Sequence, residues 1–67
     1  MAERLREIRK LKKLTQEDLA KYLNLNQSQI ARYEKGELSL NANLIKKICL
    51  YFNISADWLL GLKDNFN

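Results

Sequence analysis

The sequence predicts an all-α protein, a compact bundle of five short helices, and three observations lead to this fold class. The 67-residue chain has no proline and only two glycines, and these are the two residues that most disfavour helix. Apolar residues recur three and four positions apart, which is the spacing of one helix face. Ser, Thr or Asn stands before most of these stretches, as helix N-caps do. We expect helices over residues 2–12, 16–23, 27–35, 40–52 and 56–61, followed by a tail over 62–67.

Length and composition limit what the protein can be. A chain of 67 residues makes a single domain, 1–67. With no histidine and one cysteine, Cys49, the chain offers neither an internal disulfide nor the ligands of a zinc site. No apolar run approaches the roughly 18 residues of a membrane span, and the N-terminus lacks the apolar segment of a secretion signal. We therefore expect a soluble, cytoplasmic protein that binds no metal and no cofactor.

The positive charge of the chain is concentrated near its N-terminus. A net charge of +4 at pH 7 permits binding to a polyanion, although a solvated basic surface has the same composition. Helix 2–12 has an apolar stripe of Leu5, Ile8 and Leu11. Residues 2–13 hold only two acidic residues, Glu3 and Glu7, against six basic ones: Arg4, Arg6, Arg9, Lys10, Lys12 and Lys13.

Helix 16–23 begins with a reciprocal cap. The hydroxyl of Thr15 can accept from the amide of Asp18, whose carboxylate can reach back to the amide of Thr15. The helix is expected to stop before Asn24, because asparagine tolerates the left-handed conformation that commonly follows a helix. Its buried face consists of Leu19, Ala20 and Leu23.

Helix 27–35 follows after only three residues. Asn26 is its N-cap, and Gln29 stands at the position from which a side chain reaches back to the cap. Gly36 provides the left-handed stop. The residues that can pack are Ile30, Ala31 and Tyr33.

The last two helices are expected to begin after serine caps. Ser39 caps helix 40–52, and Ser55 caps helix 56–61, with Asp57 in the first turn where an acidic residue suits the helix dipole. Gly61 ends the last helix. The apolar stripes consist of Leu40, Leu44, Ile45, Ile48, Cys49 and Phe52 in the first of these helices and of Trp58 and Leu59 in the second.

The turn between helices 16–23 and 27–35 carries the main indication of function. Residues 24–26 are so few that the two helices must cross sharply, with Leu25 buried at the corner and the small Ala20 letting the axes approach. This is the geometry of a helix-turn-helix. In that arrangement the second helix protrudes, and its N-terminal residues face outward.

Three polar residues of helix 27–35 are candidates for reading DNA bases. In the major groove, glutamine can pair with N6 and N7 of adenine, arginine with O6 and N7 of guanine, and serine with several base edges. At about 100° per residue, Ser28 and Arg32 share a face and Gln27 lies beside it. Each could instead be an ordinary surface residue, but the set, behind so short a turn and beside a basic helix, favours base reading.

Two stretches of the chain match a known pattern. LTQEDLAKYLNLNQSQIARYEKG contains T-Q-E-x-L-A, Q-S-x-I and R-Y-E-x-G in order, and LIKKICLYFNISADWLLG ends in I-S-x-x-W-L-L-G. Over roughly residues 3 to 61, the sequence resembles the phage repressor and Cro-like (XRE-type) helix-turn-helix family of bacterial and phage regulators. The resemblance implies a lambda-repressor-like five-helix domain that docks its third helix in the major groove of double-stranded DNA.

The resemblance also implies contacts for individual residues. Gln27, Ser28 and Arg32 match base-reading positions. Gln16 stands where relatives bind a backbone phosphate, and helix N-termini also suit anions on physical grounds. Further contacts to the DNA backbone are implied for Thr15, Asn26, Gln29 and Lys35.

Arg9 and Glu34 match a family ion pair that connects the first helix to the third. Removing one partner of a buried pair leaves the other charge desolvated. We therefore interpret Arg9 as structural and the other basic residues of the first helix as a general positive potential. Relatives usually have glycine at the positions of Lys13, Asn24 and Asn53, and Lys13 therefore predicts a slightly different end to the first helix.

Dimerisation is expected because one such domain reads few base pairs. Family members commonly bind two half-sites about one helical turn apart, so a homodimer is expected, either in solution or only on DNA. More apolar residues gather near the C-terminus than a five-helix core needs. The expected dimer contacts are Trp58, Leu59, Leu62 and Phe66, unless Trp58 belongs to the core.

The function that these observations favour is sequence-specific DNA binding by a transcription regulator, with repression as the family default. An enzyme is disfavoured, because the chain has no histidine and Cys49 lies on an apolar stripe. A protein-interaction module remains the alternative, because similar domains serve as antitoxins or bind partner proteins. Salt distinguishes the two, since DNA binding weakens steeply as salt rises and a protein-binding groove is far less sensitive.

Overall fold

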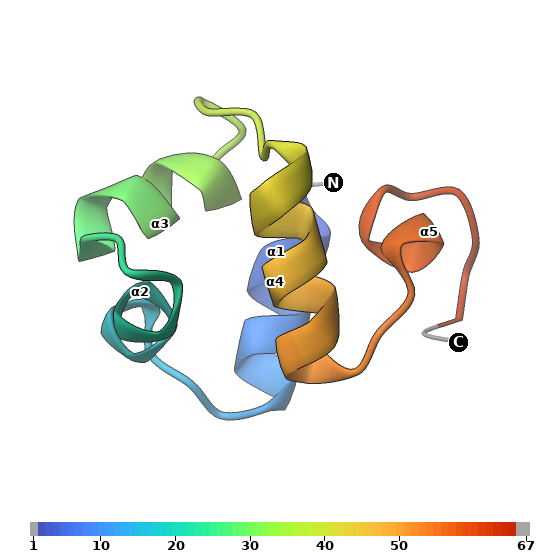
Figure 1. Cartoon of the computed structure of the whole chain (residues 1–67), viewed down its shortest axis with the longest axis horizontal. Helices are drawn as coiled ribbons and strands as arrows, with labels where there is room; N and C mark the ends of the chain where they lie inside the picture. The colour runs from blue at the N-terminus through green and yellow to red at the C-terminus, as the bar shows by residue number, and fades with distance from the viewer. Residues whose placement is uncertain (1, 66–67) are drawn as a thin grey trace.

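The computed structural model describes residues 2–65 and is all-helical over that range. Figure 1 shows α2 and α3 on one side of α1 and α4, with α5 and the C-terminal segment on the other side. The predicted all-α bundle of five helices is confirmed for the described residues. None of these helices is long and apolar enough to cross a membrane. Their bounds are α1 Ala2–Leu11, α2 Gln16–Leu23, α3 Gln27–Glu34, α4 Ala42–Phe52 and α5 Ala56–Leu59.

Every helix contributes side chains to one apolar core. Burying a large aliphatic or aromatic side chain stabilises the fold by about 1.5–3 kcal/mol, so these residues supply most of the favourable free energy of folding. The buried set matches the apolar stripes of the sequence with few exceptions. It consists of Leu5, Ile8, Leu19, Ala20, Leu23, Ile30, Leu44, Ile48, Phe52, Trp58 and Leu59.

Leu11 is the exception in the first helix. It was expected in the same stripe as Leu5 and Ile8, but 58% of its surface is exposed. Leu11 is the last residue of α1, and the chain turns toward α2 immediately afterwards. The expectation is therefore wrong for this residue.

The start of α4 also differs from the prediction. The helix begins at Ala42 and not at residue 40, and its N-cap is Asn41 and not Ser39. The side-chain oxygen of Asn41 accepts from the amide of Leu44 at 2.9 Å. The other helix ends lie within two residues of their expected positions, which is the ordinary spread of helix boundaries.

All five helices of the described chain end in the same way. A left-handed residue follows each helix, and the next residue donates its amide to the carbonyl five positions back, at N–O distances from 2.7 to 3.0 Å. This is the Schellman arrangement, which satisfies helical carbonyls that would otherwise lack a partner. The expectation that Lys13 changes the end of α1 is wrong, because Lys13 adopts the left-handed conformation itself. The five residues are Lys13 (φ 60°), Asn24 (61°), Gly36 (82°), Asn53 (56°) and Gly61 (82°).

Candidate nucleic-acid interface

The connection between α2 and α3 is the helix-turn-helix expected from the sequence. Asn24 is left-handed, and the amide of Leu25 donates to the carbonyl of Ala20 at 2.8 Å. Leu25 packs against the core, and Asn26 is extended and caps α3. The turn therefore redirects the chain sharply within three residues, and α2 and α3 cross (Figure 1).

Both helices of this motif begin with a reciprocal cap. Thr15 Oγ1 accepts from the amide of Asp18, and Asp18 Oδ2 accepts from the amide of Thr15, both at 3.0 Å. Hydrogen bonding of the Asp18 carboxylate, to the Thr15 backbone amide first and to the Thr15 side chain second, holds the pKa of Asp18 below its ordinary value. In α3, Asn26 Oδ1 accepts from the amide of Gln29 at 2.9 Å, and Gln29 Oε1 accepts from the amide of Asn26 at 3.0 Å.

Capping leaves donors for a second partner. The caps use the oxygens of Thr15 and Gln29 as acceptors, so the amide protons of Gln29 are not engaged by them. Both side chains lie at helix N-termini, where backbone amides favour an anion. The geometry is therefore compatible with the expected contacts to DNA phosphates.

A buried ion pair connects α1 to α3. Arg9 Nε lies 2.6 Å from Glu34 Oε2, and Arg9 Nη2 donates to Glu34 Oε1 at 3.1 Å. The two side chains are only 9% and 3% exposed. Arg9 Nη1 also donates to the carbonyl of Leu14 at 2.7 Å. The ion pair implied by the family resemblance is present, and it holds the end of α1 as well as α3.

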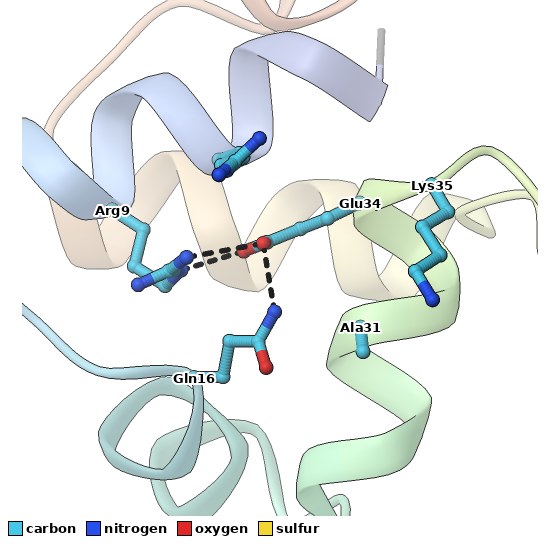
Figure 2. A pocket seen from close by; sticks show the side chains of 6 residues that line it. Arg9, Gln16, Ala31, Glu34 and Lys35 are labelled. Atoms are coloured by element: carbon cyan, nitrogen blue, oxygen red, sulfur yellow. Dashed lines mark hydrogen bonds and ion pairs between the residues drawn. The ribbon is translucent and has the colours of Figure 1, made fainter.

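Gln16 extends this pair to the first residue of α3. Figure 2 shows Arg9, Gln16 and Glu34 pointing toward one another from three helices. Gln16 Nε2 donates to Glu34 Oε1 at 3.1 Å, and Gln16 Oε1 accepts from Gln27 Nε2 at 3.3 Å. A carboxylate can only accept, so Glu34 fixes which end of the Gln16 amide faces Gln27. The candidate reader Gln27 is thereby oriented, through Gln16, by the buried carboxylate of Glu34.

The three candidate base readers lie on the exposed side of α3. Gln27 and Ser28 are exposed, whereas Ile30 of the same helix is fully buried. Ser28 Oγ donates to Asn26 Oδ1 at 2.7 Å. The Arg32 side chain is 54% exposed, and its Nε lies 3.4 Å from Glu37 Oε1 in a solvated ion pair. Their placement agrees with base reading, and the role itself remains a prediction.

A hollow of about 240 Å³ lies where α1, α2 and α3 meet. Glu34 balances the charge of Arg9 inside it, so Arg6 and Lys35 leave the wall net positive. The interpretation of Arg6 as general potential missed this position. Arg6 lies one helical turn before Arg9, a spacing that puts two residues on one face and could have indicated it. The lining residues are Arg6, Arg9, Gln16, Ala31, Glu34 and Lys35.

The expected dimer contacts are only partly at the surface. Trp58 is 2% exposed and Leu59 is fully buried, so both belong to the core and cannot supply contact area. The expectation is wrong for these two residues, because α5 inserts them against α4 and α1. Leu62 is 73% exposed and Leu60 is 39% exposed. Phe66 lies outside the described residues.

Comparison with known proteins gives the family. The helix-turn-helix family model HTH_3 matches residues 5–59. HTH-type transcriptional regulator MJ0272 of Methanocaldococcus jannaschii is 34% identical over 97% of this chain and 98% of its own length. Antitoxin PezA of Streptococcus pneumoniae is 33% identical over 85% of this chain, which spans only 36% of PezA. Two Bacillus subtilis HTH-type regulators are likewise longer, with 56% and 48% of their lengths matched.

A solved structure agrees with the family model. The P22 c2 repressor, in complex with a synthetic operator, superimposes with a TM-score of 0.83 at 27% identity. The match covers 92% of this chain and 94% of the repressor chain. The order of the helices, the three-residue turn and these matches together show that the chain belongs to the helix-turn-helix family of the phage repressor (XRE) type.

Proposed function

We propose that this protein is a transcription regulator that binds double-stranded DNA in a sequence-specific manner and represses the gene it covers. The observation that carries the proposal is the exposed polar face at the start of α3, directly behind a three-residue turn. The family and the operator-bound c2 repressor support it. In this arrangement α3 lies in the major groove, and α2 crosses the DNA backbone.

Gln27 is the best oriented of the proposed base readers. One of its amide protons engages Gln16, which leaves Oε1 and the second proton for a base. That pair of groups matches N6 and N7 of adenine. To contact guanine, Arg32 must first release Glu37. This release costs little free energy, because ion pairs as exposed as this one contribute little to stability.

Backbone phosphates are the proposed partners of the positive hollow and the helix caps. Arg6 and Lys35 line the hollow from α1 and from the end of α3, and Gln16 lies at the N-terminus of α2. The caps add Thr15, Asn26 and Gln29. Such contacts fix the position of α3 without reading sequence, and they release counterions.

Two copies are proposed to bind one operator. A single α3 spans one half-site, and an inverted repeat with half-site centres about 10 bp apart places two copies side by side. The apolar surface available for this contact is Leu60 and Leu62, since Trp58 and Leu59 are buried.

A regulator that binds a partner protein is the second candidate function. The similarity to antitoxin PezA supports it, and so does an exposed aromatic pair. Tyr22 of α2 stacks on Tyr51 of α4 at 3.8 Å between ring centroids, with 48% and 39% of their surfaces exposed. Neither residue belongs to α3, so such a partner would leave the proposed DNA-reading face uncovered.

Selection from a random duplex pool at near-physiological salt tests the proposal. An enriched inverted repeat supports dimeric reading, and a single enriched half-site supports reading by one copy. The matched control carries Gln27→Ala, Ser28→Ala and Arg32→Ala, which should lose the enrichment and keep weak salt-sensitive binding. Absence of enrichment for the unaltered protein, with binding that vanishes as salt rises, would contradict the DNA-reading function and favour the partner-binding one.

A further inference from the structure

One side chain of α1 holds the segment that follows α5. Arg4 Nη1 donates to the carbonyl of Trp58 at 2.9 Å and to that of Lys63 at 2.7 Å. The guanidinium carbon lies 5.0 Å from the centroid of the Trp58 ring, a cation–π distance. Arg4 Nη2 also lies 3.9 Å from Oδ1 of Asp64. Contacts from one residue therefore cover the chain from α5 to residue 64.

These contacts fix the backbone around an exposed leucine. The amide of Leu62 donates to the carbonyl of Asp57 at 2.7 Å, and the next carbonyl, that of Lys63, accepts from Arg4. Leu62 is nevertheless 73% exposed, the most exposed of the large apolar residues in the described chain. Together with Leu60, which is 39% exposed, Leu62 gives an apolar surface whose backbone is already ordered, so contact with another molecule would cost little ordering entropy.

We propose that Arg4 positions the self-association surface through which two copies bind adjacent half-sites cooperatively. The proposal rests on the DNA-binding function proposed above. Without the Arg4 contacts, residues 61–65 would have to become ordered when two copies meet, and that entropic cost would weaken the association. Arg4 thus acts through Leu62 and does not need to touch DNA.

A second copy of this chain is the partner that the surface fits. A twofold contact places residue i of one copy against residue j of the other, and j against i, so the surface must complement itself. Leu62 is apolar and is followed by a cation, Lys63, and then by an exposed anion, Asp64. Two such segments side by side can pair leucine with leucine and lysine with aspartate.

The direction of the arginine side chains separates this role from DNA binding. Arg9 pairs with Glu34, and Arg6 lines the positive hollow. Arg4 contacts the C-terminal segment, and its side chain is only 27% exposed. The initial interpretation of Arg4 as general positive potential therefore does not describe its contacts.

The test compares binding to a duplex with one half-site and to a duplex with the inverted repeat. The ratio of the two affinities gives the cooperativity. Arg4→Gln should reduce the cooperativity about tenfold, within the usual range of coupling between sites. Lys10→Gln is the control, because it removes the same charge from the same helix and should weaken binding to both duplexes equally. Unchanged cooperativity in Arg4→Gln would overturn the proposal.

A second readout follows the segment itself. Amide hydrogen exchange at Leu62, whose amide donates to the carbonyl of Asp57, should become faster in Arg4→Gln, and a merely electrostatic role would leave it unchanged. Leu62→Ala should lose cooperativity with little change in amide exchange at residue 62. The double variant should lose no more cooperativity than Leu62→Ala alone, because both residues act in one contact. If Arg4→Gln does not fold, Arg4→Lys replaces it in each measurement, because it keeps the charge but removes the planar guanidinium that contacts the two carbonyls and the Trp58 ring.

The outcomes separate this proposal from the function on which it rests. If the unaltered protein reads a half-site but binds the repeat without cooperativity, DNA reading stands and the role of Arg4 is overturned. If it shows no sequence preference, the proposed function fails, and sedimentation of the protein without DNA decides the role of Arg4. A dimer weakened by Arg4→Gln would support the role, and a monomer would overturn it.

Discussion

The regions around α3 and α5 are held in place in different ways. Hydrogen bonds and an ion pair position α3, through Arg9, Gln16 and Glu34. Burial of Trp58 and Leu59 supplies most of the contacts of α5, which has only four helical residues, and Arg4 adds a hydrogen bond to the Trp58 carbonyl. Polar contacts are directional, whereas apolar burial is not. A helix that must present side chains in one orientation therefore benefits from several polar contacts, and a helix that closes the core can rely mainly on burial.

The largest expected effect comes from breaking the buried ion pair. Glu34→Ala should lower the free energy of unfolding by about 3–5 kcal/mol, because Arg9 is left buried without a counter-charge. The control is Glu37→Ala, which breaks the exposed pair with Arg32 and should cost less than about 1 kcal/mol. Urea unfolding measures both. Equal losses in the two variants would show that burial of the first pair has no energetic consequence.

Leu59 and Leu62 provide the corresponding comparison around α5. Leu59→Ala should destabilise the fold by about 2–5 kcal/mol, because it opens a cavity in the core. Leu62→Ala removes the same atoms from an exposed position and should change the free energy of unfolding by about 0.5 kcal/mol or less. Thermal or urea unfolding checks the pair. If Leu59→Ala lowered the free energy of unfolding only slightly, the assignment of Leu59 to the core would be wrong.

Two basic residues at the end of α3 should differ in the kind of effect they have on DNA binding. Arg32→Ala should relax the preference at one base pair by about 1–3 kcal/mol. Lys35→Ala should weaken binding to all sequences alike and reduce the salt slope by about 1. Titration of single-base operator variants at several salt concentrations separates the two. A uniform loss for Arg32→Ala would remove it from the base readers.

The helix ends allow a smaller comparison. Lys13 holds a left-handed conformation that costs a non-glycine residue free energy, whereas Gly36 holds one without strain. Lys13→Gly should raise the free energy of unfolding by about 0.5 kcal/mol once the greater freedom of the unfolded chain is included. Gly36→Ala should lower it by about 1 kcal/mol. Unfolding curves that shift in the same direction would contradict this account.

The smallest expected effect is a pH dependence of the α2 cap. The folded state lowers the pKa of Asp18, so this carboxylate stabilises the fold at pH values above its ordinary value of 3.8. The contribution should be lost as pH falls below that value and through the folded pKa. The stability difference between the protein and Asp18→Asn, measured from neutral to strongly acidic pH, should shrink accordingly. The corresponding difference for Gln29→Ala in the uncharged cap of α3 should stay constant.

Sequence patterns predicted the features that depend on neighbouring residues. The caps at Thr15, Asn26 and Ser55 are confirmed, because capping involves only residues two or three positions apart. The cap of α4 was wrong, since Ser39 and Asn41 are both good caps and only the folded backbone selects one.

Features that depend on distant parts of the chain could not be predicted from the pattern. Helix 56–61 is too short for its periodicity to show whether Trp58 and Leu59 face inward or outward. The Arg9–Glu34 pair was expected only by resemblance to the family. The bond from Gln16 to Glu34 and the contacts of Arg4 with residues 58 and 63 join segments far apart in sequence. No local spacing indicates such contacts, and the structure was needed to find them.

The identical left-handed stop after every helix has a consequence for how fast the chain folds. The stop of each helix is formed by residues within about two turns of its C-terminal end. The position of the stop therefore does not depend on long-range contacts. Helical domains rich in local contacts fold in microseconds to milliseconds. We expect this chain to fold on that timescale, so a molecule that unfolds transiently would recover its native conformation quickly.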